Sequence, residues 1–187
     1  MTLDQMTATI PFGIGVAASS RIGNILGSGQ GRLAKQAAIS SIILATLIGG
    51  MVGSILVGTR KSFGYLFTRD QEVVSAIAQV LPVVGAVQIS DAWAQACAGI
   101  IRGIGMQHFG AVVNAIAYYA LALPLGFALA FKAHMGLVGL WLAQCLALLL
   151  VAMLEFGLIS CLNWEKEVIK ALKRVKAHSQ EKEASAH

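Results

Sequence analysis

The sequence predicts an all-α, polytopic membrane helix bundle with about five transmembrane helices. Hydrophobic residues make up 57% of the 187 residues and charged residues only 12%, and the mean hydropathy is +0.73. A soluble domain rarely has this balance. Uncharged stretches close to the roughly 20 residues that a hydrocarbon core requires recur along the chain. Short segments rich in Gly, Arg and Gln join them, which favours compact turns between antiparallel helices.

Five segments are expected to cross the membrane. The first is the weakest, because it is short and contains Pro11 together with several Thr and Ser residues. The other four have stronger patterns, and Pro82 and Pro124 predict bends within two of them. In chain order the segments are Gln5 to Ser20, Gln36 to Thr59, Val73 to Ser90 with its continuation past Asp91, Phe109 to Phe131, and Met135 to Leu154.

Small residues four apart predict where these helices approach one another closely. Three glycine pairs with this spacing are candidates, because residues of this size let membrane helices come into backbone contact. The pairs are Gly23 with Gly27, Gly49 with Gly53, and Gly99 with Gly103.

The distribution of Lys and Arg predicts the orientation. If the first segment runs inward, ten basic residues lie in inner loops and the tail, whereas Arg60, Lys61, Arg69 and Lys132 lie outside. Cytoplasmic loops carry an excess of Lys and Arg, so the C-terminus is expected in the cytosol. The loops near Gly29 and near Thr68 are then expected on opposite sides.

The pattern changes after Trp164. Val168, Ile169, Leu172 and Val175 recur at helical spacing among lysines and arginines, which predicts a basic amphipathic helix on the anionic cytoplasmic leaflet. Residues from Gln180 to His187 are expected to be disordered. The chain therefore divides into a membrane part, residues 3–164, and a cytosolic part, residues 165–187.

Asp91 is the strongest candidate for a functional residue. It has long uncharged stretches on both sides, and a charge at the centre of a spanning helix costs about 2.5 to 3.5 kcal/mol. Gln88 and Gln95 lie three and four residues away, so all three share one face of the helix, which continues to Arg102. One polar stripe on an apolar helix predicts the lining of a substrate or ion pathway.

Two further sets of polar residues lie in the last spans. Asn114 and Tyr118 share a helix face, and either join helices or contact a substrate or proton. Glu155 follows a long uncharged stretch and shares a face with Gln144. It is either an acid with water access at the inner leaflet or part of a proton relay.

Other classes of function lack support in the sequence. Cys97, Cys145 and Cys161 fall in or beside apolar spans without metal-ligand spacing, and no nucleotide-binding motif occurs, so we expect no cofactor and no metal. The net charge of +5 fits inner loops and tail better than nucleic-acid binding. A membrane-embedded enzyme would need a second acid or a His near Asp91 and a loop that binds a lipid headgroup. The sequence shows neither, so we expect no enzyme.

Three stretches resemble the eukaryotic type of the multidrug and toxin extrusion (MATE) transporter family. The match extends over nearly all residues from about 5 to 164. The stretches are Pro11 to Gly29 (PFGIGVAASSRIGNILGSG), Asp91 to Gly105 (DAWAQACAGIIRGIG) and Gly110 to Gly126 (GAVVNAIAYYALALPLG).

The resemblance implies helices eight to twelve of a twelve-helix fold with two six-helix lobes. It also implies exchange of a proton or sodium ion for an organic cation or other xenobiotic by alternating access. Asp91 falls where the family has an acid in helix ten that is implicated in cation recognition and proton coupling. The family's acid in helix seven and its N-terminal lobe have no counterpart here, which is the pattern of a fragment.

The resemblance further implies a multi-pass protein of the plasma or vacuolar membrane. The alternative is a membrane subunit or truncated product that does not transport and packs against other membrane proteins.

Overall fold

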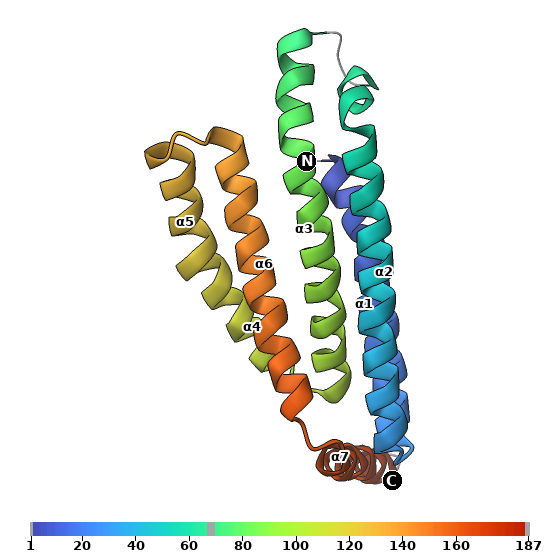
Figure 1. Cartoon of the computed structure of the whole chain (residues 1–187). Helices are drawn as coiled ribbons and strands as arrows, with labels where there is room; N and C mark the ends of the chain where they lie inside the picture. The colour runs from blue at the N-terminus through green and yellow to red at the C-terminus, as the bar shows by residue number, and fades with distance from the viewer. Residues whose placement is uncertain (1, 67–69, 186–187) are drawn as a thin grey trace.

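The computed structural model describes residues 2–66 and 70–185. Long helices run side by side, and a further helix lies across one end of the bundle (Figure 1). The elements are α1 (Thr2–Gly27), α2 (Gly31–Phe63), η1 (Gly64–Leu66), α3 (Gln71–Ile104), α4 (Gln107–Ala115), η2 (Ile116–Ala122), α5 (Leu123–Phe127), η3 (Ala128–Lys132), α6 (Gly136–Cys161) and α7 (Trp164–Ser185). The segments α4, η2, α5 and η3 follow one another as a single rod.

Four helical stretches of the described chain are long and apolar enough to cross a membrane: Gly31–Arg60, Gln71–Ile104, Gln107–Lys132 and Gly136–Cys161. Four of the five predicted spans overlap these stretches. The fifth expected span lies in α1, a helix of 26 residues that packs along α3 and α2. Its Asp, Gln, Thr, Ser and Arg residues lower its hydropathy, which is the weakness that the sequence already indicated.

The turns between helices have clear local causes. Asp70 caps α3, because its side chain accepts a hydrogen bond from the Glu72 backbone N–H at 3.0 Å. Gly105 ends α3 in the left-handed conformation, with φ of 85°, and Gly29 adopts the same region between α1 and α2. Residues without a side chain adopt this conformation at little cost.

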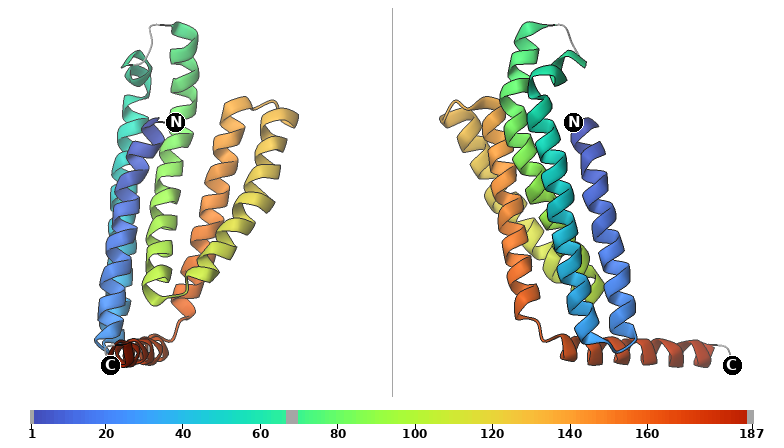
Figure 2. Two further views of the ribbon diagram at one scale, coloured as in Figure 1. Left: turned by 180° about the vertical axis from the view of Figure 1, so that it is seen from behind. Right: turned by 45° about the vertical axis from the view of Figure 1, so that its right-hand side comes forward.

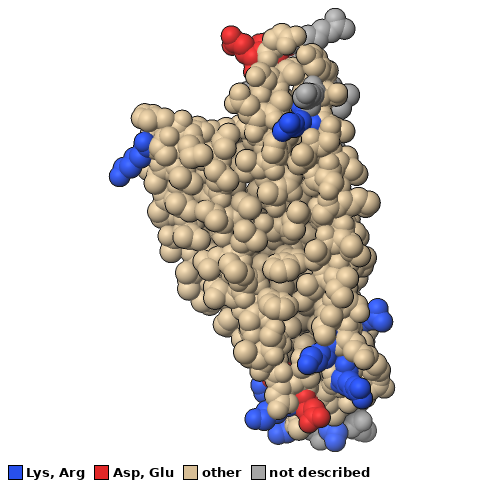
Figure 3. Space-filling view, in the orientation of Figure 1, with Lys and Arg blue, Asp and Glu red and all other residues tan. Residues whose placement is uncertain are grey.

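The ends of the bundle agree with the expected alternation. The α1–α2 turn and the α3–α4 turn lie at the end that α7 covers, and the turn that leads into α6 lies at the opposite end (Figure 1). On the face drawn in Figure 3, Lys, Arg, Asp and Glu gather toward the two ends and leave the middle uncharged. Thr68 and Arg69, in the other expected outer loop, lie outside the described residues.

α3 is the central helix and packs by glycine contacts. A Cβ atom at Gly99 would meet the Gly15 backbone of α1, and one at Gly53 of α2 would lie 2.6 Å from the Gly85 carbonyl oxygen. Gly49 and Gly103 are similarly close to α3 and α1. The small-residue pairs on α2 and α3 are thus confirmed as packing sites. The α1 pair was wrong at its second member, because a Cβ atom at Gly27 would meet nothing within 4 Å.

The rod from α4 to η3 is not a regular helix. In η2 the backbone is π-helical, and the Leu123 N–H donates to the Tyr118 carbonyl, five residues earlier. Proline lacks an N–H and its ring clashes with the carbonyl four residues before it. Pro124 is the second residue of α5, two positions after the end of η2. The bend expected at this proline therefore takes the form of a wider helical turn on its N-terminal side.

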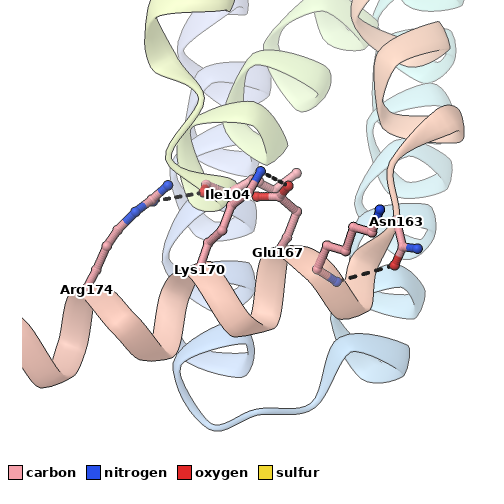
Figure 4. A network of polar contacts seen from close by, with 6 residues as sticks. Ile104, Asn163, Glu167, Lys170 and Arg174 are labelled. Carbon is pink, nitrogen blue, oxygen red and sulfur yellow. Dashed lines mark hydrogen bonds and ion pairs between the residues drawn. The ribbon is translucent and has the colours of Figure 1, made fainter.

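α7 lies across the ends of the other helices and extends past α1 (Figure 2). Its Trp164 and Val168 side chains are buried in the cluster that joins α1, α2, α3 and α6. The Arg174 guanidinium donates to the Ile104 carbonyl at 3.2 Å, and Lys170 pairs with Glu167 at 2.7 Å (Figure 4). The amphipathic helix is therefore docked on the bundle.

Helix α7 continues to Ser185, so the expectation of disorder from Gln180 was wrong over this stretch. Glu, Lys, Gln and Ala fill residues 180–184, and all of them are good helix formers. Residues 186–187 lie outside the described part.

Candidate functional site

Asp91 lies in the second half of α3 and is half-buried. Its two neighbours in sequence face other helices. Ala92 is fully buried beside Gly49 of α2, and the Ser90 hydroxyl lies 3.4 Å from Cys145 Sγ of α6. The carboxylate therefore belongs to the strip of α3 between these two contacts.

The polar stripe around Asp91 changes in burial along the helix. Gln88 is only 1% exposed, Asp91 and Gln95 are half-buried, and Arg102 is exposed. The Arg102 guanidinium lies 5.9 Å from the centre of the Phe12 ring on α1, within the range of a cation–π contact. The stripe thus runs from the protein interior outward along one helix.

Asn114 and Glu155 form a second polar contact, between α4 and α6. The Asn114 side-chain N–H group donates to the Gly110 carbonyl at 2.9 Å and, at 3.5 Å, to Glu155 Oε1. Glu155 is 0% exposed. Of the two alternatives for Glu155, an acid with water access does not fit this conformation, because α4 covers the side chain.

Tyr118 and Gln144 form the third contact, between η2 and α6. The Gln144 amide donates to the Tyr118 hydroxyl at 3.2 Å. Both residues line an open groove of about 640 Å³ between the rod and α6, together with Asn114, Tyr119, Leu140 and others. Gln144 was not among the predicted site residues. The sequence did indicate Gln144, because an amide side chain within a membrane span needs a polar partner there.

The structure therefore brings the six candidate residues into two groups. Gln88, Asp91 and Gln95 form the α3 group, and Asn114, Tyr118 and Glu155 form the group between the rod and α6, to which Gln144 is added. In the described parts of the chain, no cluster of three or more His, Cys, Asp or Glu side chains has the arrangement of a metal site.

Comparisons with known proteins place the chain among membrane transporters. The family described as MatE matches residues 1–128. Multidrug and toxin extrusion protein 1 of Oryctolagus cuniculus is 38% identical over 84% of this chain and 28% of its own length. Protein DETOXIFICATION 15 of Arabidopsis thaliana is 37% identical over 93% of this chain and 36% of its own length.

Two solved structures have the same fold. The crystal structure of the eukaryotic MATE transporter AtDTX14 superposes with a TM-score of 0.87 at 35% identity, over 93% of this chain and 39% of that one. A multidrug resistance MATE family transporter in an inward-facing conformation matches with a TM-score of 0.76 at 19% identity, which concerns the fold alone. The chain thus spans roughly a third of the length of the proteins it matches. Its sequence and its helix arrangement agree, and the chain belongs to the MatE family of multidrug and toxin extrusion transporters.

Proposed function

We propose that this chain is the C-terminal part of an efflux transporter that exchanges a proton or sodium ion for an organic cation. The observation that carries the proposal is Asp91, a half-buried acid within the central helix of a membrane bundle. An acid at this depth is retained only where its charge meets water, a cation or a polar partner. The relatives' names refer to multidrug and toxin extrusion, which supports a xenobiotic as the cargo.

In the proposed mechanism Asp91 binds either the coupling ion or the cationic substrate. Both ligands neutralise the same carboxylate, so binding of one disfavours the other, and this competition couples their movements. Gln88 and Gln95 supply amide groups on the same helix face, one turn to either side. They would hydrogen-bond to the carboxylate or to polar groups of the substrate.

Asn114 and Tyr118 are proposed to extend the substrate surface on the rod. Tyr118 presents an aromatic ring beside the 640 Å³ groove, and aromatic faces attract organic cations. Its hydroxyl is held by Gln144, which fixes the ring's orientation. Replacing Tyr118 with Phe would therefore loosen the ring without removing its apolar area.

The orientation is part of the proposal. The C-terminal end, with α7, would lie in the cytosol of a plasma or vacuolar membrane. Lys166, Lys173 and Lys176 are exposed on α7, as are Ile169 and Val175. Basic and apolar side chains on one interfacial helix suit an anionic lipid surface.

The experiment on Asp91 uses a complete transporter that contains this segment. Asp91→Asn keeps the shape and removes the charge, so insertion should survive while ion-driven efflux of a fluorescent cation collapses. Asp91→Glu should keep part of the activity. Efflux and surface expression are measured together, and normal efflux by the Asn variant at normal expression would exclude Asp91 from the mechanism.

A second candidate is a membrane subunit that does not transport. It is favoured by the exposed apolar residues Ile10, Phe12 and Val16 on α1, which suit contact with another membrane protein. Proteoliposomes that contain only this chain test whether it transports by itself, which neither candidate expects. We expect no efflux of organic cations from them, because the chain corresponds to one wall of the enclosure; ion-driven efflux would contradict this expectation.

A further inference from the structure

Glu155 is a buried acid that the proposed exchange at Asp91 does not use. It lies in the second half of α6, and its side chain is fully enclosed. Oε1 accepts the long hydrogen bond from Asn114, and Oε2 has no hydrogen-bond partner among the described atoms. Buried polar atoms are normally paired, so this oxygen requires an explanation.

The helices around Glu155 supply little compensation for a negative charge. From α3, Cys97 and Arg102 are the titratable and charged neighbours. Cys97 is buried, whereas Arg102 is exposed, and no Lys or Arg of the described chain lies within ion-pair distance of Glu155. From α4, the neighbour is the neutral amide of Asn114.

Other elements packed on α6 carry their polar groups elsewhere. In η2, the Tyr118 hydroxyl is bound to Gln144, about 16 Å along the helix from Glu155 at 1.5 Å per residue. In η3, Lys132 is exposed and lies shortly before the first residue of α6, the end away from Glu155. α5 contains no titratable residue.

A carboxylate in such a setting is too costly to keep ionised. Transferring a carboxylate from water to the protein interior carries a large desolvation cost, and one long hydrogen bond offsets little of this cost. The protonated acid avoids this cost, with Oε1 as the acceptor from Asn114 and Oε2 carrying the hydrogen. The geometry is that of a neutral acid enclosed between two helices.

We propose that Glu155 is a proton-binding site, separate from the Asp91 group, that holds its proton in this conformation and whose deprotonation separates α4 from α6. The inference does not depend on transport by Asp91. Loss of the proton leaves a carboxylate facing Gly110 and Asn114, and α4 moves away so that water reaches the charge. The π-helical turn of η2, directly after α4, is where the rod can adjust, since such turns are often found at functional positions in helices.

The first test is infrared spectroscopy of the purified chain in lipid nanodiscs at neutral pH. The wild type minus Glu155→Gln difference spectrum should contain the C=O stretch of a protonated carboxylic acid. Asp91→Asn, as the matched control, should leave this band in place. If Glu155→Gln does not fold, Asn114→Ala keeps the acid and should move the band to higher frequency, because the carbonyl loses its hydrogen bond. A spectrum with only carboxylate bands from Glu155 would overturn the proposal.

The second test measures the predicted movement. Spin labels at Val112 on α4 and Met153 on α6 report the distance between the helices, since both side chains are exposed. The native cysteines are first replaced. Raising the pH should lengthen the distance in the chain with Glu155 and leave it unchanged in the Glu155→Gln variant. An equal response in both chains, or none in either, would contradict the proposed link.

Discussion

The contact between Gly99 and Gly15 predicts a sharp difference between two glycine substitutions. A Cβ atom added at Gly99 would lie 2.6 Å from Gly15 Cα, whereas ordinary contacts begin at 3.4 Å. Gly99→Ala therefore forces α1 and α3 apart by at least about 0.8 Å, because the Gly15 carbonyl oxygen lies closer still to the added atom. Gly13, one half-turn from Gly15 on α1, has nothing within 4 Å of the same added atom. Both substitutions gain up to about 1 kcal/mol of helix propensity, so this gain cancels in the comparison.

Overpacking of a tight contact costs about 1 to 3 kcal/mol. We expect Gly99→Ala to be less stable than Gly13→Ala by this amount, which corresponds to roughly 2 to 12 °C in Tm for a chain of this size. Thermal unfolding of both purified variants in the same detergent measures the difference. Equal melting temperatures would refute the close α1–α3 packing.

Two further predictions concern the ends of the bundle. In a background without native cysteines, Ser28→Cys and Ala177→Cys should react with an impermeant reagent from the same side, and Ala133→Cys from the other; labelling of all three from one side would contradict the topology. Arg174→Ala removes the bond to the Ile104 carbonyl, at a cost of about 1 kcal/mol, so amide exchange in α7 should accelerate about fivefold. Lys173→Ala, which removes an exposed charge, should leave the exchange rate unchanged, and equal acceleration in both variants would argue against docking by Arg174.

The membrane helices were predictable because their signal is composition over a long window. Lipid requires every backbone group to be paired within the segment, so an uncharged stretch of the right length has few alternatives to a helix. The same reasoning explains why α1 was the weakest of the predicted spans, since its polar residues lower its hydropathy. The glycines of α2 and α3 were predictable as contact points for a related reason, since small residues at this spacing have a packing role in membranes.

The details of the site were less predictable, because helical spacing gives a face but not its neighbours. Gln88 and Asp91 share a face as predicted, yet Gln88 is buried and Asp91 is half-buried. The burial of Glu155 depends on α4, more than 40 residues away in sequence. The π-helical turn before Pro124 depends on how the rod packs on α6, and the proline alone predicted only a bend.

In the proposed exchange Asp91 binds the organic cation in competition with the coupling ion, and competition with a proton can be measured as proton release. The binding of a labelled organic cation to a purified complete transporter is measured together with the number of protons released per cation in weak buffer. Wild-type protein should release protons as the cation binds, and Asp91→Asn should bind more weakly and release none from this site. Equal affinity and equal proton release in the two proteins would contradict the claim.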